Sequence, residues 1–307
     1  MIFPPNEVNA PTVVLVHGLV PKGYRDPALE IVAVQLAQIG FRVVVPNLSA
    51  EQQMLMRPSD LDDIGTAIQW SAKRFRQRVT LVGISFGGGL VIAVADMPQY
   101  SHLLKLVFSY AGYNSTDRLG RYYIGDRVTT PDGQPYREAP PEMAPLTIAL
   151  QYLGDMVPEQ DIPVFRKVIL TQLSSQSGAP ASVDVLTPAQ RALYDDLRTV
   201  KSSAAREKYH RLLERHRVEQ AALSPHGHMQ ALHTPLYILH GTWDVTIPAG
   251  ETQWTVHEIP PGADIHAIAT PWLVHATLWG QTSFREKFRV GNFVCDFLMR
   301  ALRPAPL

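Results

Sequence analysis

The chain contains a single cysteine, Cys295, and no excess of charge of either sign. One cysteine excludes a disulfide bond within the chain. Lys and Arg together number 28, as do Asp and Glu, so the formal net charge is zero and neither nucleic acid nor an anionic membrane is a favoured partner. The first residues show neither a basic segment followed by a long apolar run nor a membrane span. These absences lead us to expect a soluble, cytoplasmic protein.

Strand and helix signals alternate through the first part of the chain. Short apolar runs predict strands over 12–16, 41–45, 79–82 and 103–110. Between them, Asp26 followed by Pro27 predicts the start of one helix, and Ser59-Asp60-Leu61-Asp62 predicts a second helix opened by a capping box. The same alternation returns late in the chain, with strands over 235–240 and 264–269. Such alternation predicts an α/β fold with a mostly parallel sheet flanked by helices.

The alternation breaks between residues 113 and 232, where we find no convincing buried strand. Helices are predicted over about 162–173 and, after Thr187-Pro188, in a long stretch reaching about 222. We interpret 113–232 as a mainly helical cap inserted into a core formed by 1–112 and 233–307. The alternative is an independent second domain, which the length of the segment would permit.

Gly83-Ile84-Ser85-Phe86-Gly87 is the most informative stretch of the sequence. It follows the apolar run 79–82 and precedes an apolar helical series, which gives the order strand, sharp turn, helix. In this setting a G-x-S-x-G pattern places its serine in a strained turn with the hydroxyl exposed. The sequence therefore predicts a nucleophilic Ser85, whereas the alternative is a plain Gly-rich connection.

A serine nucleophile needs a base, and the base needs a carboxylate that orients it. Asp244 and His275 both follow late strands, at the edge of the sheet where Ser85 would lie. We favour them over two other carboxylates and three other histidines. These competitors are Asp117, Asp264, His240, His257 and His266. Asp264 precedes its strand, and His240 is expected to anchor a turn.

Acyl transfer also needs donors for an oxyanion. The backbone amide of Phe86 lies at a helix N-terminus beside Ser85, and the loop after strand 12–16 offers a second amide, that of Leu19. We predict that these two amides form an oxyanion hole.

Together these segments resemble the α/β-hydrolase superfamily, specifically its esterase and lipase members. The resemblance covers roughly 11–112 and 224–302. It lies in His17-Gly18, the turn around Ser85, His240 to Asp244 with Ile247-Pro248, and His275. It implies a catalytic triad of Ser85, Asp244 and His275, an oxyanion hole at Leu19 and Phe86, and no cofactor. The cap matches no pattern that we can name.

Aromatic residues near these segments are candidates for substrate contact. They are Tyr24, Tyr113, Trp243 and Trp272. For Tyr24 the alternative is a solvated loop residue, and for Tyr113 it is packing of the cap onto the sheet. His226, His228 and His233 lie close in sequence, but no thiolate or carboxylate set accompanies them, so we expect no metal site.

The sequence thus predicts an esterase that acts on a small-molecule ester. Amide or peptide cleavage, carbon–carbon cleavage and acyl transfer remain open, because the same triad serves them all. A non-catalytic ligand-binding protein and an interaction module built on the cap are further alternatives. The sequence indicates neither the oligomeric state nor the substrate.

Overall fold

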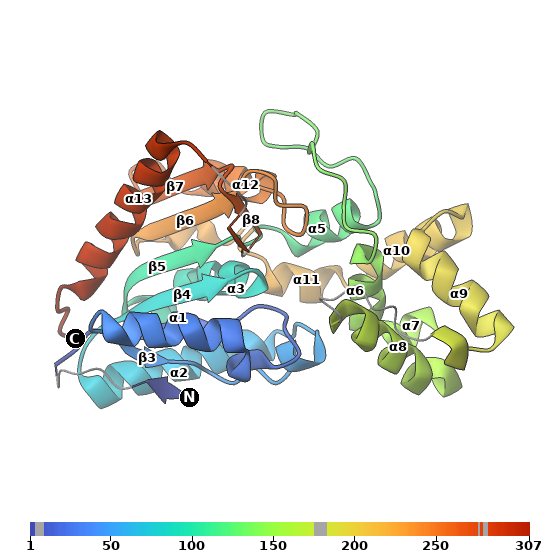
Figure 1. Cartoon of the computed structure of the whole chain (residues 1–307), viewed down its shortest axis with the longest axis horizontal. Coiled ribbons are helices and arrows are strands. Elements are labelled where there is room, and N and C mark those ends of the chain that lie inside the picture. Colours follow the sequence, from blue (N-terminus) through green and yellow to red (C-terminus); the bar gives the residue numbers. More distant parts are fainter. Residues whose placement is uncertain (4–8, 175–182, 276, 279–281) are drawn as a thin grey trace.

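A computed structural model describes residues 1–3, 9–174, 183–275, 277–278 and 282–307, and shows a seven-stranded sheet with helices on both faces (Figure 1). The strand order is β1-β3-β2-β4-β5-β6-β7, and only β1 runs antiparallel to its neighbour. The strands are β1 (Ile2–Phe3), β2 (Thr12–Val16), β3 (Arg42–Val44), β4 (Val79–Ile84), β5 (Leu104–Tyr110), β6 (Leu236–Gly241) and β7 (Ile265–Thr270). A separate hairpin joins β8 (Leu273–Val274) to β9 (Thr277–Leu278). The predicted α/β architecture is confirmed, and β1 and the hairpin were not predicted.

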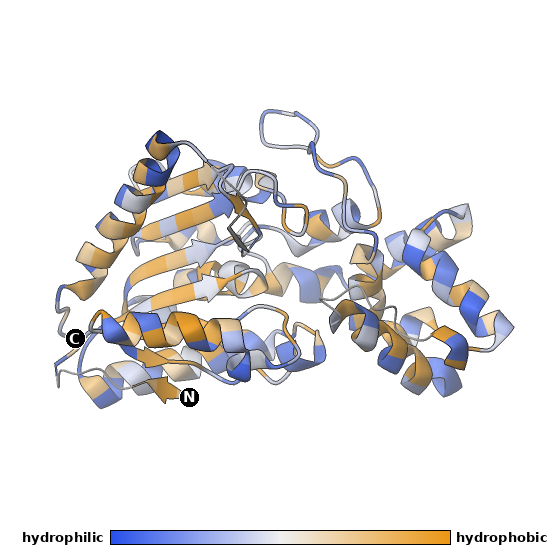
Figure 2. Cartoon of the chain, in the orientation of Figure 1, coloured by the Kyte–Doolittle hydropathy of each residue, from blue (hydrophilic) through white to orange (hydrophobic). Residues whose placement is uncertain are grey.

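Side chains of each strand alternate between two apolar layers. On β4, Val79 and Leu81 pack against α2 (Ser59–Phe75) and α3 (Phe86–Asp96), while Val82 faces α1 (Pro27–Gln38) and α13 (Phe284–Leu302). The strands are accordingly mostly orange in Figure 2 and become paler toward their carboxyl ends, since a parallel sheet is buried on both faces. The short helix α4 (Pro98–Ser101) and α12 (Gly250–Glu258) complete the core.

The helix ends show one success and one error of the sequence interpretation. The Asp26 carboxylate accepts hydrogen bonds from the amides of Ala28 and Leu29, as an N-cap should, and Pro27 is the first residue of α1. The capping box predicted at Ser59 is absent. The helix begins there after Pro58, and Asp60 instead accepts from the Arg57 amide. A true capping box forms at Thr187 and Gln190, at the start of α9.

Residues 113–232 contain helices and no named strand in their described part. The helices are α5 (Thr116–Tyr123), α6 (Ala144–Gln151), α7 (Leu153–Met156), α8 (Ile162–Ser174), α9 (Pro188–Thr199), α10 (Ser203–Arg215) and α11 (Arg217–Leu223). Short 3₁₀ turns lie at Gly23–Arg25, Glu51–Gln53, Glu159–Asp161, Val183–Val185 and Met229–Ala231. The single long helical stretch predicted after Thr187 is three helices, because Val200 takes a left-handed conformation (φ 49°) and Ser202 caps a new helix.

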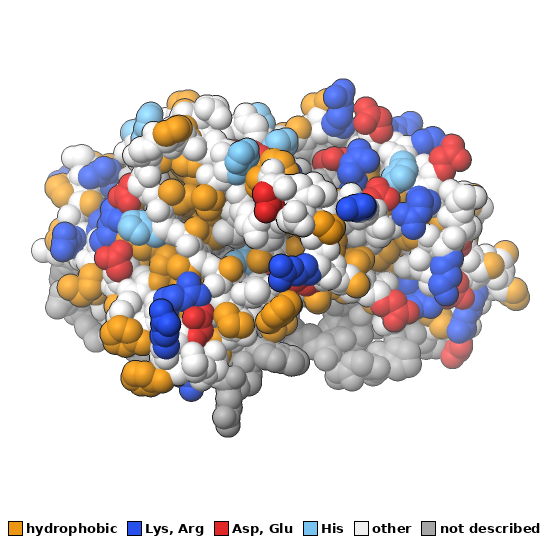
Figure 3. All heavy atoms as spheres, turned by 90° about the horizontal axis from the view of Figure 1, so that it is seen from above, with side chains coloured by type: hydrophobic (Ala, Val, Ile, Leu, Met, Phe, Trp, Pro, Cys, Tyr) orange, Lys and Arg blue, Asp and Glu red, His pale blue; other side chains and the backbone are white. Residues whose placement is uncertain are grey.

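Helices α6 to α10 lie beside the core, on the side toward which the carboxyl ends of the strands point (Figure 1). They share an apolar centre that includes Phe165, Leu197 and Tyr209, and this centre continues through Tyr113 to Phe86 at the start of α3. The outer surface over α9 and α10 carries interspersed charges of both signs (Figure 3), with pairs such as Arg211 and Glu207. None of the helices in the described ranges combines the length and the apolar character needed to cross a bilayer.

Candidate active site

Ser85 occupies the sharp turn between β4 and α3. Its backbone has φ 58° and ψ −126°, a conformation that costs a non-glycine residue about 1–3 kcal/mol. The surroundings hold it there, because the Ser85 amide donates to the Tyr110 carbonyl at 2.8 Å. A Cβ on Gly87 would lie 2.3 Å from the His17 carbonyl oxygen, so the turn packs this closely on the neighbouring loop only with glycine at that position.

The side chains of Ser85, His275 and Asp244 form one chain of hydrogen-bonding distances. Ser85 Oγ lies 2.9 Å from His275 Nε2, and His275 Nδ1 lies 2.8 Å from Asp244 Oδ2. Asp244 follows β6, and His275 sits in the hairpin after β7 with a left-handed φ of 47°. Three segments far apart in sequence therefore place a hydroxyl, an imidazole and a carboxylate in line at the carboxyl edge of the sheet.

The loop that carries Asp244 is fixed from several directions. Asp244 is fully buried, and its Oδ1 accepts from the Thr246 and Ile247 amides at 2.9 and 3.0 Å. The hydroxyls of Tyr122 and Tyr123 on α5 donate to the carbonyls of Val245 and Thr246, each at 2.9 Å. The contact of these two tyrosines with the Asp244 loop was not predicted from the sequence.

His240 anchors the same loop from below, as expected for a histidine that ends its strand. It is fully buried, its Nε2 lies 2.7 Å from the Ile247 carbonyl, and its Nδ1 lies 2.7 Å from Thr252 Oγ1. Burial by itself would raise the pKa of Asp244. The hydrogen bonds with His240 and His275 outweigh burial and hold the pKa of this carboxyl well below its usual range. Asp244 is therefore ionised at neutral pH, as a carboxylate that orients an imidazole must be.

The amides of Leu19 and Phe86 both remain available to a ligand. Neither N–H group is bonded to an acceptor within the part of the chain that the structure describes. Gly18 brings the Leu19 loop against Ser85, since a Cβ on Gly18 would lie 2.9 Å from Ser85 Cβ. The position of Phe86 at the start of α3 adds the positive end of the helix dipole. Free donors of this kind are what a developing oxyanion requires.

A buried ionisable pair beneath this loop was not predicted. His17 Nδ1 lies 2.9 Å from Glu51 Oε2, and the two side chains are 1% and 0% exposed. Burial raises the pKa of Glu51 to about 7, and it raises the pKa of nearby Asp60 to about 6. No pattern in the sequence marks Glu51 as buried, because it is followed directly by two further polar residues, Gln52 and Gln53.

The competing residues lie elsewhere. Asp264 precedes β7 and pairs with Arg300, and Asp117 pairs with Arg121 on the surface of α5. His266 bonds to Asp264, and His257 lies on α12 against the ring of Trp254. His226 bonds to Glu258. Among the described residues no group of three or more His, Cys, Asp or Glu side chains is arranged to hold a metal ion.

The aromatic candidates divide between pocket and packing positions. Tyr113 is fully buried against Phe86, and its hydroxyl donates to the Leu223 carbonyl at 2.8 Å. This position corrects its proposed role as a substrate contact and favours the packing alternative. Trp243 is 49% exposed, Trp272 lies near Lys287, and Tyr24 accepts a hydrogen bond from Arg25. None of the four lines the pockets beside Ser85, whereas Tyr110 does.

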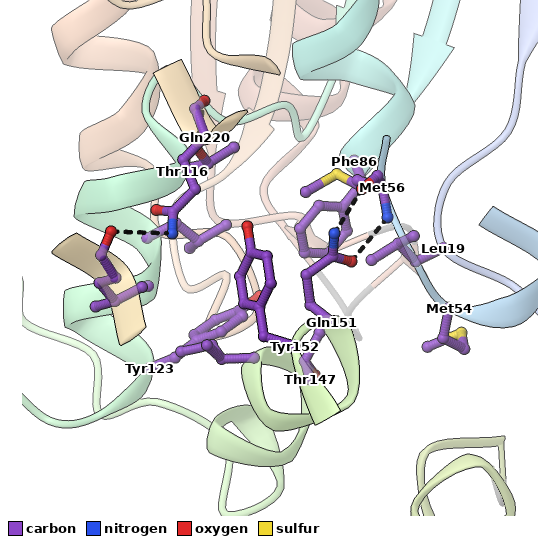
Figure 4. Close-up of a pocket in the computed structure, with 14 residues that line it drawn as sticks. Leu19, Met54, Met56, Phe86, Thr116, Tyr123, Thr147, Gln151, Tyr152 and Gln220 are labelled. Atoms are coloured by element: carbon purple, nitrogen blue, oxygen red, sulfur yellow. Dashed lines mark hydrogen bonds between the residues drawn. The ribbon is translucent and has the colours of Figure 1, made fainter. Parts of the chain in front are cut away.

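Two pockets meet at Leu19. One has a volume of about 60 Å³ and lies between the core and the helices after β5 (Figure 4). Gln151 on α6 closes one side of it through two hydrogen bonds with the backbone of Met56, at 2.9 and 2.5 Å. The second, of about 750 Å³, contains Ser85 and His275 in its lining.

Neither a protein-family model nor a curated protein matches this sequence. Among solved structures, an acylaminoacyl peptidase in complex with Z-Gly-Gly-Phe-chloromethyl ketone has a TM-score of 0.51 at 18% identity over 98% of this chain. Uncomplexed Pyrococcus horikoshii acylaminoacyl peptidase has a TM-score of 0.50 at 17% identity over the same share. The chain spans 39% of the length of each peptidase. Est1E from Butyrivibrio proteoclasticus with bound ferulic acid has a TM-score of 0.49 at 13% identity, over 99% of this chain and 95% of that one.

The fold class follows from three observations. They are the strand order of the sheet, the strand–turn–helix around Ser85, and the two structural matches at a TM-score of 0.50 or above. The chain has the α/β-hydrolase fold. This likeness establishes the fold that the sequence predicted, and the chemistry has to be argued from the residues of this chain.

Proposed function

We propose that this protein is a serine hydrolase that cleaves carboxylic esters through an acyl-enzyme on Ser85. The observation that supports it most is the unbroken series from Asp244 through His275 to Ser85, with contacts of 2.8 and 2.9 Å. Ser85 and His275 are 190 residues apart in sequence, and the other ring nitrogen of His275 contacts a buried carboxylate. Such an arrangement is not expected of an ordinary surface serine. The series matches the roles of nucleophile, base and orienting acid.

In the proposed reaction Ser85 Oγ attacks the ester carbonyl carbon, and His275 Nε2 takes the hydroxyl proton. The carbonyl oxygen becomes negative and accepts hydrogen bonds from the Leu19 and Phe86 amides. The carbon–oxygen bond to the alcohol then breaks, and His275 returns the proton to the departing alcohol. Water repeats the attack on the acyl-enzyme and releases the acid. No step in this sequence calls for a cofactor.

The segment 113–232 is proposed to act as a cap over this site, with 1–112 and 233–307 as the core. Supporting this division, α5 contacts the loop of Asp244 through Tyr122 and Tyr123, and α6 contacts Met56 through Gln151. The small pocket of Figure 4 lies between these two parts. A cap at this place would limit access of substrate and water to Ser85.

The same residues would serve other acyl chemistry. Cleavage of an amide or peptide, cleavage of a carbon–carbon bond, or acyl transfer to another acceptor are the alternatives within the enzyme class. The two acylaminoacyl peptidases of similar fold support amide or peptide cleavage as one of these alternatives. A non-catalytic ligand-binding role is the alternative outside the enzyme class. A panel of p-nitrophenyl esters, matched anilides and a diketone separates these reactions, and we expect the esters to be turned over fastest.

The primary test is Ser85→Ala. We expect the wild-type protein to hydrolyse p-nitrophenyl acetate and to be labelled by a fluorophosphonate probe, and we expect the variant to lose both properties while it keeps its thermal unfolding transition. Ser203→Ala is the matched control, because Ser203 is exposed at the start of α10. Turnover that persists in a folded Ser85→Ala protein would overturn the assignment of the nucleophile.

A further inference from the structure

The larger of the two pockets extends far beyond the reacting groups. It begins at Ser85 and His275 and continues between α1 and α13. Its floor is formed by sheet residues such as Val82, Ile84 and Phe108, and its walls by Val32 and Leu36 of α1 and Leu298 of α13. We call this space the α1–α13 trench. In Figure 1 the strands β4 and β5 are visible between the two helices, with no helix in front of them.

The trench exists because the two helices cover opposite halves of the sheet. The C-terminal half of α13 packs over β5 and β6. The rings of Phe297 and Phe108 lie 4.6 Å apart there, and those of Phe297 and Tyr237 lie 5.5 Å apart. Toward the other edge, Leu29 and Ala33 of α1 join the apolar layer over β2 and β3. The strip of sheet between them is left partly accessible, so Ile84 and Tyr110 are only half-buried. A central strand of a sheet covered on both faces would normally be buried throughout.

The lining of the trench is mostly apolar, and its length suits an extended chain. Its wall along α1 runs from Ala28 to Ile39, which at the rise of an α-helix is roughly 16 Å. Figure 2 shows hydrophobic residues along α1 and in a stripe on α13. The Asp26 carboxylate near the mouth is occupied as the N-cap of α1, so it offers the trench little free charge. Water in such a space gains few hydrogen bonds, and an alkyl chain would displace it favourably.

We propose that the α1–α13 trench binds the acyl chain of the substrate, and that long-chain acyl esters are therefore the substrate class. This inference rests on the proposed function, because it places the ester carbonyl on Ser85. The other pocket at Leu19, with about 60 Å³, is too small for such a chain. His275 must protonate the departing alcohol, and its side chain is 25% exposed, so the alcohol leaves toward solvent while the acyl chain remains along α1.

The trench predicts a dependence on chain length. The transfer of one methylene from water to an apolar site strengthens the binding constant by up to about fourfold. For p-nitrophenyl acetate, butyrate, octanoate and dodecanoate we therefore expect kcat/KM to rise until the trench is filled. Lengthening the alcohol while the acyl group stays acetyl should change kcat/KM little. The reverse pattern would overturn the placement of the acyl chain.

Val32→Trp and Val34→Trp make a matched pair on α1. Val32 lines the trench, whereas Val34 is 38% exposed and does not line it. We expect Val32→Trp to lower the ratio of dodecanoate to acetate kcat/KM by about tenfold or more, because the indole fills space that the chain needs. Val34→Trp should leave that ratio unchanged. Leu298→Trp, on the opposite wall, repeats the test in case Val32→Trp does not fold.

A binding measurement separates this inference from the proposed chemistry. In the Ser85→Ala protein, sodium dodecanoate below its micellar concentration should bind by calorimetry, and adding Val32→Trp or Leu298→Trp should remove the binding. Unaltered dodecanoate binding in both folded double variants would refute the proposal that the trench binds the acyl chain. The esterase proposal would not be affected. If the folded Ser85→Ala protein still hydrolyses p-nitrophenyl acetate, that result would instead refute the proposed function itself.

Discussion

Replacement of Asp244 by Asn tests the proposed site most directly. Asn has nearly the same size and shape, so the buried position can accept it. Because Oδ1 of Asp244 serves the amides of Thr246 and Ile247, the new amide must keep its oxygen there. Its NH₂ group then faces His275 Nδ1, which is forced to act as an acceptor. The imidazole proton moves to Nε2, and that atom can no longer take the proton of Ser85.

The expected loss follows from the interactions removed. The charge-assisted hydrogen bond to His275 contributes about 1.5–3 kcal/mol, and the lost attraction between carboxylate and imidazolium in the buried site adds a similar amount. A total of about 3–6 kcal/mol corresponds to a fall in kcat of roughly two to four powers of ten. The KM for the ester should change little, because the substrate does not contact Asp244.

The measurement is steady-state hydrolysis of a p-nitrophenyl ester, with thermal unfolding as the check on folding. Asp264→Asn and Asp117→Asn are the controls, since both carboxylates were competitors for the same role and both are paired at the surface. Their kcat values should stay close to that of the wild type. A folded Asp244→Asn protein with unchanged kcat, or an equal loss in either control, would refute the reasoning.

Three further changes probe the supports of the site. Tyr123→Phe removes the donor to the Thr246 carbonyl and should lower the free energy of unfolding by about 1–3 kcal/mol in urea titrations, which an unaltered midpoint would contradict. Gly87→Ala places a Cβ 2.3 Å from the His17 carbonyl oxygen and should reduce both stability and ester hydrolysis, whereas Gly291→Ala, with open space around it on α13, should stabilise by about 0.5–1 kcal/mol. Since burial raises the pKa of Glu51 to about 7, its contribution to stability is present below about pH 4.5 and is lost as the pH rises through 7. Glu51→Gln should therefore flatten the fall in unfolding free energy over that range, by about 3 kcal/mol, while exposed Glu30→Gln leaves it unaltered.

Local patterns were sufficient for the elements that carry the site. The run 79–82 followed by Gly83 to Gly87 predicts strand, turn and helix because glycine alone fits two of those positions, and the structure places β4, Ser85 and α3 there. The order of Ser85, Asp244 and His275 along alternating strands was enough to predict that they share one edge of the sheet. Their role as a catalytic triad remains a proposal.

The sequence interpretation failed where several segments compete for one contact. Ser59 and Thr187 both carry the pattern of a helix start with a polar residue three positions on, but only Thr187 and Gln190 form the reciprocal bonds. Next to Ser59, the carboxylate of Asp60 instead accepts a hydrogen bond from the Arg57 amide. Tyr113 fills the space above Gly89, where an added Cβ would lie 2.4 Å from its ring, so its direction is decided by a partner distant in sequence.

Periodicity and turn chemistry thus determined the sheet, its helices and the chain positions of a hydroxyl, an imidazole and a carboxylate, because these depend on neighbours a few residues away. Only the tertiary structure decided that Tyr122 and Tyr123 bond to the loop of Asp244, that Glu51 is buried beside His17, and that α1 and α13 leave a trench between them. Those features depend on packing between segments separated by tens to hundreds of residues, and no local pattern encodes how far two helices stand apart on a sheet.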